Sequence, residues 1–247
     1  MAKAKADGYT VLIHHIGMST APSLYRKLAY NPMTDFEMIG LINEVPMTIV
    51  ARKDFPANNM KDFIATVKKD AKKWNLANAG LGAASHLCGM LFQSYVGVDL
   101  TTVPYKGTAS AMNDLMGGQI DLLCDQTSGT VPLIKASRIR AIAAAGPQSI
   151  ASMPDMPAIS EAGVSGVDIN ISFGLYAPKG TPKAEIDKLS QALQAAVVDT
   201  EVKSKLDAMG VAAVGPELAR PEALRAHLRK EIDVLGGLLI KAGVKPE

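Results

Sequence analysis

Short apolar runs and amphipathic runs alternate along almost the whole chain, at strand-like and helix-like spacing. Strands are expected at residues 11–14, 37–42, 47–51, 74–78, 100–103, 120–125, 139–144 and 169–177. Helices are expected around 24–25 and at 60–72, 87–96, 109–116, 131–136, 181–198, 200–209 and 221–241, with a turn at 16–20 and a surface loop at 146–157. This alternation is typical of an α/β protein with a largely parallel sheet that helices cover on both faces.

Two extended runs, at 44–48 and 167–173, lie on either side of the middle of the chain. If both cross between lobes, residues 45–167 form a domain that is inserted into another domain made of residues 1–44 and 168–247. The expected layout is therefore two lobes joined by a two-strand hinge, with a ligand between them.

Two turns marked by glycine carry the most informative chemistry. Gly80 and Gly82 follow the expected strand at 74–78, and Gly107 follows the expected strand at 100–103; each turn leads into a helix. Successive units of this kind place helix N-termini at the carboxyl edge of one sheet, where unpaired N–H groups and the helix dipole favour an anion. The pattern predicts a seat for a carboxylate or a phosphate.

Polar side chains at turns accompany these glycines, and each allows two interpretations. The small hydroxyl residues Ser19, Thr20, Ser85, Thr108, Thr127 and Ser128 could cap helices or donate to a ligand. Asp125 ends an otherwise apolar strand, where it could accept from a ligand ammonium or hydroxyl, or cap the next helix.

Nucleotide sites fit these turns poorly. The first turn approximates a dinucleotide fingerprint, but the next strand ends in Val103 where that fingerprint needs an acidic residue. In the second turn Lys106 precedes Gly107, the reverse of the order in a phosphate-binding loop. No nucleotide cofactor is therefore predicted.

Catalytic and metal sites are not predicted either. Ser85 and His86 are adjacent, so on a helix they point in different directions. His14 and His15 are neighbours at a strand end, where they face opposite sides of the sheet and cannot bind one metal together. His227 lies on a charged helix and is expected to be solvated.

Composition and charge exclude several classes of protein. The chain has 247 residues, of which 48% are hydrophobic, and a formal net charge of +2 whose basic residues do not cluster. A nucleic-acid surface is therefore unsupported, and no apolar run approaches the ~20 residues of a membrane span. The basic start lacks an apolar signal region. Cys88 and Cys124, the only cysteines, are either two half-buried thiols or one bridge.

A series of segments, weak singly but specific in this order, resembles the solute-binding receptors of tripartite tricarboxylate transporters, also called Bug receptors. The resemblance covers essentially the whole chain. Its carriers are Asp7-Gly8-Tyr9-Thr10, Leu24-Tyr25, Tyr30-Asn31-Pro32, Asp35-Phe36, Ala79-Gly80-x-Gly82-x-x-Ser85-His86-Leu87, Val103-Pro104-Tyr105-Lys106-Gly107, Asp114-Leu115-x-Gly117-Gly118-Gln119-Ile120-Asp121, Pro154-Asp155-x-Pro157, Glu161-Ala162-Gly163 and Gly174-Leu175-x-Ala177-Pro178-x-Gly180-Thr181-Pro182.

The resemblance implies a type II periplasmic-binding-protein architecture that closes on a small organic acid, often a dicarboxylate, and presents it to membrane subunits of the transporter. The two glycine turns would hold one carboxylate, Asp125 would face the cleft, and the turn at 17–20 would contribute from the other lobe. The ligand-binding residues implied in this way are Gly17, Met18, Ser19, Thr20, Ala79, Gly80, Gly82, Ala83, Ala84, Ser85, His86, Lys106, Gly107, Thr108, Ala109, Asp125, Ser172 and Phe173.

Three departures from the family pattern qualify these expectations. Family members normally have a signal peptide, a strand, a Gly-rich loop and a helix before the Asp-Gly-Tyr-Thr element, so we expect a terminal lobe that is incomplete through truncation or a misassigned start. Ser172 stands where the family often has a large aromatic residue, and Ile16-Gly17-Met18 replaces a more polar turn. Both indicate a ligand with an apolar body.

The function expected from the sequence is capture of a carboxylate in the periplasm without catalysis, cofactor or metal. Two alternatives use the same architecture. One is a ligand-sensing module that feeds a signalling partner, and the other is an enzyme, such as a deaminase or lyase, on a similar two-lobed scaffold. The enzyme would need an acid or base pair, for which Asp125 and His86 are the remote candidates.

Overall fold

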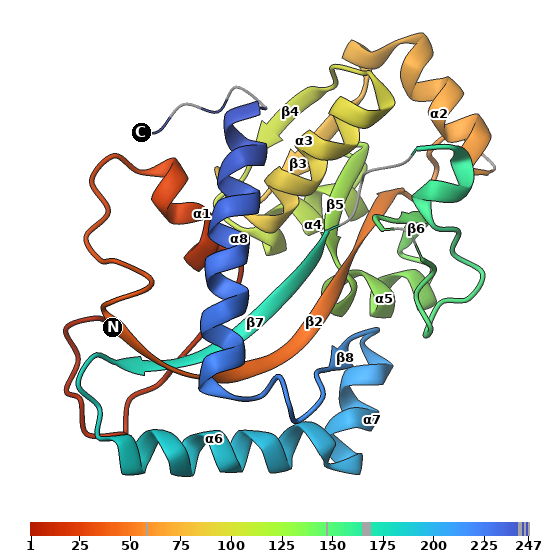
Figure 1. Ribbon diagram of the computed structural model, residues 1–247. Coiled ribbons are helices and arrows are strands. Elements are labelled where there is room, and N and C mark those ends of the chain that lie inside the picture. The colour runs from red at the N-terminus through yellow and green to blue at the C-terminus, as the bar shows by residue number, and fades with distance from the viewer. Residues whose placement is uncertain (58, 147, 165–168, 242–243, 245, 247) are drawn as a thin grey trace. The chain divides into compact units, whose positions relative to one another are not determined.

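The computed structural model describes residues 1–57, 59–146, 148–164, 169–241, 244 and 246 of the chain (Figure 1). Contacts divide the chain into two compact units. The terminal unit comprises Met1–Glu44, Ser172–Asp207 and Ala212–Glu247, and the inserted unit comprises Val45–Ile171 and Ala208–Val211. The predicted domain boundary at 167/168 lies outside the described residues. Residues 169–171 and 208–211, which the sequence assigns to the terminal lobe, group with the inserted unit. A hinge between two lobes stays a prediction.

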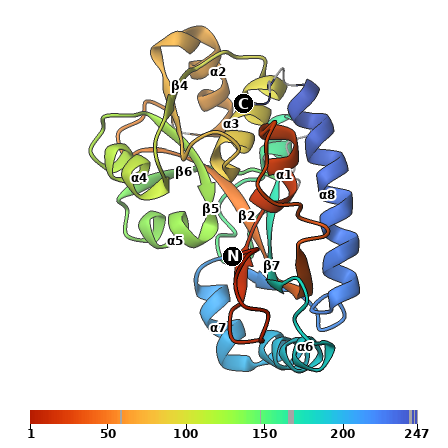
Figure 2. The same cartoon turned by 90° about the vertical axis from the view of Figure 1, so that its left-hand side faces the viewer.

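The terminal unit is a small sheet with helices around it. Its elements are β1 (Leu12–His14), α1 (Gly17–Leu24), the first part of β2 (Phe36–Arg52), most of β7 (Asn170–Pro178), α6 (Lys183–Val198), α7 (Thr200–Ala208), β8 (Ala212–Ala213) and α8 (Pro221–Lys241). β1 pairs antiparallel with β7, and β8 pairs antiparallel with β2. The short α1 lies along α8 (Figure 2).

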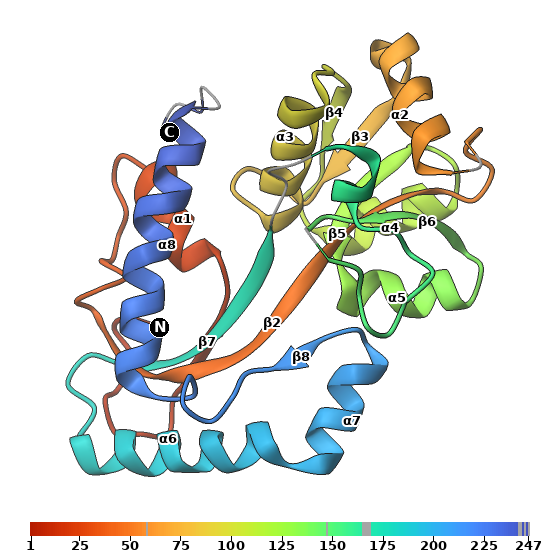
Figure 3. The ribbon, with the colours of Figure 1, turned by 45° about the vertical axis from the view of Figure 1, so that its right-hand side comes forward.

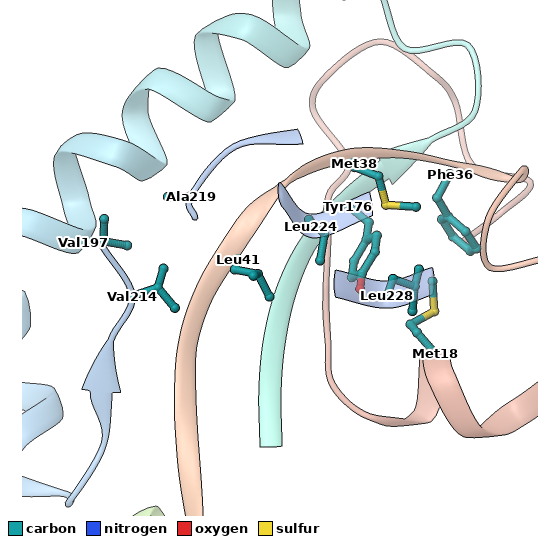
Figure 4. Packing of buried hydrophobic residues seen from close by; sticks show 10 residues of the cluster. All are labelled: Met18, Phe36, Met38, Leu41, Tyr176, Val197, Val214, Ala219, Leu224 and Leu228. Carbon is teal, nitrogen blue, oxygen red and sulfur yellow. The ribbon is translucent and has the colours of Figure 1, made fainter. Parts of the chain in front are cut away.

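The core of the terminal unit forms where α1 and α8 meet the strands (Figure 4). Met18 of α1 and Leu228 of α8 pack with Tyr176 of β7 and with Phe36 and Met38 of β2, and all five are almost completely buried. The rings of Phe36 and Tyr176 meet edge to face at 6.2 Å, an arrangement that aromatic pairs prefer. This packing fixes the start of α1, where several predicted site residues lie.

The inserted unit is an α/β sandwich around the second part of β2 (Figure 3). Its elements are α2 (Met60–Lys69), a 3₁₀ turn (Ala71–Lys73), β3 (Asn75–Asn78), α3 (Ala84–Val96), β4 (Thr101–Pro104), α4 (Thr108–Met116), β5 (Leu122–Gln126), α5 (Thr127–Lys135), β6 (Ile139–Ala144), a second 3₁₀ turn (Ile159–Ala162) and the start of β7. β3 is parallel to both β4 and β5, whereas β2 is antiparallel to β5 and β6.

Local chemistry explains where these helices begin and end. The Asn59 side chain accepts the Asp62 N–H at 2.9 Å and caps α2, as the sequence predicts. α2 ends at Lys69, earlier than the predicted residue 72, because Asp70 leaves the helical region at φ −152° and ψ 64°. α3 ends at Val96, and the Gly97 that caps it has a left-handed φ of +73°, which glycine adopts without steric cost.

A buried disulfide ties α3 to β5. Cys88 and Cys124 are at most 1% exposed, and their Cα atoms lie 6.0 Å apart. Of the two interpretations that the sequence allowed, the bridge is therefore the one that the structure has. It joins the helix that begins at the first glycine turn to the strand that carries Asp125.

Three sequence predictions about the fold are wrong. The sheet is mixed, since β2 pairs antiparallel with β5, β6 and β8, whereas β3 pairs in parallel with β4 and β5. The runs at 37–42 and 47–51 are one strand, because Asn43 and Glu44 stay extended and pair with β8, a strand that the sequence did not predict. The expected turn at 16–20 is already helical, with α1 beginning at Gly17.

Candidate functional site: an anion seat on the inserted unit

The parallel strands bring both glycine turns to one edge of the sheet. Asn78 at the end of β3 lies opposite Pro104 at the end of β4, and β5, which ends at Gln126, is the other parallel neighbour of β3. Each of these strands leads into a helix, namely α3, α4 and α5. The N-termini of these helices therefore gather at one sheet edge, as the alternation of strand and helix predicts.

The two turns contact each other directly. The Tyr105 N–H in the second turn donates to the carbonyl of Asn78 at 2.8 Å. Gly80 in the first turn has a φ of +110°, and a Cβ there would lie 3.3 Å from the Tyr105 carbonyl oxygen. Only glycine satisfies both the backbone conformation and this close approach.

Side chains of the first turn are used to hold its backbone. The Asn78 side chain accepts the Gly80 N–H at 2.9 Å, and the Ser85 hydroxyl accepts the Ala79 N–H at 2.8 Å. Ser85 is 2% exposed, so this bond is sheltered from water. Its hydroxyl hydrogen remains as a donor, which means that Ser85 can both brace the turn and bind an anion.

His86 also supports the first turn. Its Nδ1 accepts the Gly82 N–H at 3.3 Å, which assigns the ring proton to Nε2. Burial lowers the pKa of His86. The imidazole is therefore neutral near pH ~7 and presents a donor rather than a positive charge.

The second turn leads from Lys106 and Gly107 into α4. The Ser110 hydroxyl donates to the Gly107 carbonyl at 3.1 Å, and the Tyr105 hydroxyl donates to Asp114 at 2.6 Å. Lys106 and Ala109 are exposed. The first N–H groups of α4 have no partner within the helix, as at any helix start, so they are available to an anion.

Asp125 is a buried carboxyl group beside the start of α4. It is 4% exposed and accepts hydrogen bonds from the Gln126 N–H and the Thr108 hydroxyl. Burial raises the pKa of Asp125 to about 6, against the two hydrogen bonds, which lower it. A Cβ at Gly129 would lie 3.4 Å from Oδ2 of Asp125, in van der Waals contact with the carboxyl group.

Threonines around Asp125 hold the backbone rather than a ligand. Thr48 donates to the Asp125 carbonyl at 3.0 Å and lies 2.8 Å from the Thr130 hydroxyl. Thr127, at the start of α5, donates to the Gly210 carbonyl at 2.8 Å and is completely buried. These bonds fix β5 and α5 and so define where the Asp125 side chain stands.

The predicted site residues of the terminal unit are engaged within that unit. Met18 lies in its core, and Thr20 donates to the Ile16 carbonyl at 3.2 Å. Ser19 donates to Glu231 of α8 at 2.7 Å. A Cβ at Gly17 would meet the His14 ring at 2.6 Å, which explains the glycine. Ligand contacts of residues 17–20 stay a prediction, and the backbone groups of these residues are the part that could contact a ligand.

Ser172 and Phe173 lie in the part of β7 that belongs to the terminal unit. Ser172 is 7% exposed, and the Phe173 ring lies 5.4 Å from the ring of His15. Burial lowers the pKa of His15, whose Nδ1 is buried without a partner among the described residues. A role of these residues in binding also stays a prediction.

The prediction that His227 is solvated is wrong. It is half-buried, with Nε2 lying 3.3 Å from a carboxylate oxygen of Glu231 one helical turn further along α8. The neighbouring Glu231 carboxylate raises the pKa of His227, against its burial, which lowers it. The polar face of α8 here turns toward Ser19 of α1, which the helical periodicity alone could not reveal.

Two functional residues were missed from the sequence. Asn78 and Tyr105 are absent from the predicted set, although they join the two turns. The signal for Asn78 was present, since asparagine before a glycine turn commonly accepts from the N–H two residues on. The Tyr105 bond uses the backbone and leaves no such signal.

Neither a three-residue metal cluster nor a membrane-spanning helix occurs among the residues that the structure describes. Across residues 1–57, 59–146, 148–164 and 169–241, no three His, Cys, Asp or Glu side chains come together as a metal site. The helices of these same ranges include none with both the length and the apolar character of a membrane span.

Comparisons with known proteins identify relatives of the whole chain. The model of the family described as "Tripartite tricarboxylate transporter family receptor" matches residues 1–225. A UPF0065 protein of Agrobacterium vitis, from the TAR-I ttuE-ttuC' intergenic region, is 43% identical over 243 residues, which are 98% of this chain and 70% of that protein.

Solved structures agree with the family match. The periplasmic binding protein BugD superposes with a TM-score of 0.94 at 47% identity, covering 100% of this chain and 82% of that one. MatC of Rhodopseudomonas palustris with bound malate superposes with a TM-score of 0.88 at 33% identity, covering 96% of this chain and 81% of that one. A second R. palustris protein, with adipate, superposes with a TM-score of 0.93 at 31% identity, covering 100% of this chain and 82% of that one.

Proposed function

Because the chain belongs to the receptor family of tripartite tricarboxylate transporters, we propose that it captures a small organic acid, a carboxylate or dicarboxylate, for a transporter of this kind. The observation that supports this function is the contact between the two glycine turns, in which the Tyr105 N–H donates to the Asn78 carbonyl next to the turns that lead into α3 and α4. Two helix N-termini at one sheet edge suit the binding of a carboxylate group.

The ligand class follows from this seat and from the relatives. Backbone N–H groups can replace the arginine usually expected opposite a carboxylate, since each such bond to a charged acceptor is worth ~1.5 to 3 kcal/mol. Malate and adipate, the ligands of the two R. palustris proteins, both carry two carboxylates. We therefore expect dicarboxylates to bind this chain.

We place the protein in the periplasm and its partners in the membrane. The Cys88–Cys124 disulfide supports an oxidising compartment, because such bridges are rare where thiols are kept reduced. Membrane subunits of the transporter are the partners that the family implies. Binding without turnover is part of the proposal, and closure of two lobes on the ligand is its predicted conformational step.

Isothermal titration calorimetry with succinate, malate and adipate tests this function. We expect saturable binding of at least one of them and none of the matched neutral diamides, with the ligand recovered unchanged by NMR. The proposal is refuted if no carboxylate saturates the protein, or if diamides bind equally well.

A proline substitution can remove one N–H group from the seat. Ala84 is the first residue of α3, and Ala83 before it has a ψ of 156°, which suits a residue that precedes proline. Ala84→Pro should raise Kd by about tenfold or more, the value of one bond to a charged group. Lys183→Pro, at the same position of α6 after Pro182 with a ψ of 141°, is the matched control and should bind normally.

A further inference from the structure

Asp125 stands where a bound carboxylate would meet a second negative charge. It accepts from the Thr108 hydroxyl, and Thr108 is the first residue of α4. An anion bound to the first N–H groups of α4 and the Asp125 carboxylate would therefore both contact the first turn of α4. Two carboxylates that compete for donors at one sheltered place do not both stay ionised.

Among the described residues, no cation contributes to the pKa of Asp125. Lys106, two residues before Thr108, is exposed to solvent. Its close neighbours Thr48, Thr108 and Gly129 are neutral. The titratable groups on the elements packed against β5 are Glu37, Glu44 and Arg52 on β2, His86 and Tyr95 on α3, Asp114 on α4 and Lys135 on α5. Within the described residues none of them contributes to the pKa of Asp125, which burial and two hydrogen bonds determine. Arg52 is instead paired with Asp54 and Asp121.

We propose that Asp125 takes up one proton from solvent when a carboxylate ligand binds, so that capture of the ligand is coupled to proton uptake. The step is Asp125–COO⁻ plus H⁺ giving Asp125–COOH, with no other bond made or broken. The proton goes to Asp125 rather than to the ligand, because the buried carboxyl group, with a pKa of about 6, holds a proton more tightly than an ordinary solvated carboxyl group does at ~4. This inference rests on the proposed function.

Calorimetry of the wild-type chain in two buffers with different ionisation enthalpies counts the protons directly. Near pH ~7 we expect the observed heat to change with the buffer by an amount equal to the uptake of up to one proton per ligand bound. Affinity should fall as the pH rises above about 6, approaching tenfold per pH unit. Heats that are equal in both buffers, with binding intact, overturn the inference and leave the proposed function standing.

Two variants assign the proton to its residue. Asp125→Asn imitates the protonated carboxyl group, so it should abolish the buffer dependence and bind more tightly than wild type at pH ~8, by about tenfold or more. His227→Gln removes a titratable group that lies outside the anion seat and should keep the buffer dependence. If Asp125→Asn binds more weakly at every pH, Asp125 instead accepts from a ligand hydroxyl or ammonium, and proton uptake is wrong.

Discussion

Removing the Cys88–Cys124 disulfide should strongly destabilise the inserted unit. The two cysteines are 36 residues apart in the sequence, and closing a loop of that length in the unfolded chain accounts for about 4 kcal/mol of stability at 25 °C. For a unit of this size, such a loss corresponds to a fall in melting temperature of about 8 to 16 °C. The double variant Cys88→Ala and Cys124→Ala makes the change without a reductant.

Urea denaturation followed by circular dichroism, with and without dithiothreitol, measures the effect. In reductant, the free energy of unfolding of the wild type should fall by about 4 kcal/mol. The double variant should already be destabilised without reductant, and adding reductant should not change its stability further. Thiol titration of the unfolded wild type should find no free thiol before reduction. Two free thiols, or a loss in reductant below about 1 kcal/mol, would refute the reasoning, because the bridge would then not constrain the unfolded chain.

The remaining predictions concern the first turn and the polar face of α8. Gly80→Ala should lower the free energy of unfolding by about 1 to 3 kcal/mol and weaken carboxylate binding, because Gly80 has a φ of +110°. Gly97 is the control, since it has a φ of +73° and lies in open space at the far end of α3. Gly97→Ala should lower stability without changing the Kd for the carboxylate. Since Glu231 raises the pKa of His227 above 6.5, this pair stabilises the folded protein fully below pH 6.5 and loses its contribution as the pH rises through the folded pKa. Urea midpoints across this range should show that loss, and His227→Gln should remove it.

Features set by neighbouring residues could be predicted from the sequence. Asn59 caps α2 as its position before an amphipathic run indicates, and β6 has the predicted bounds of 139–144. The two glycine turns were placed at one sheet edge by the succession of strand, turn and helix alone, and the Tyr105–Asn78 bond shows that they do meet. Local periodicity is sufficient for such features because each element has its own hydrophobic face.

Features set by distant residues could not be predicted in this way. The polar Asn43 and Glu44 break the apolar pattern of β2, yet the strand continues because β8, from near the C-terminus, pairs with them. The partners of Cys88 and His227 depend likewise on which elements pack together. The pKa of Asp125 follows from burial, which the sequence indicates only by the apolar strand around it.

A crystal structure of the protein with a bound dicarboxylate would show directly whether the two glycine turns hold the ligand. We expect one carboxylate of the ligand at the starts of α3 and α4, with its oxygens about 2.7 to 2.9 Å from backbone N–H groups of the two glycine turns. The Ser85 hydroxyl should donate to the same carboxylate. If both carboxylates are held elsewhere and both turns are left to solvent, the anion seat does not bind the ligand.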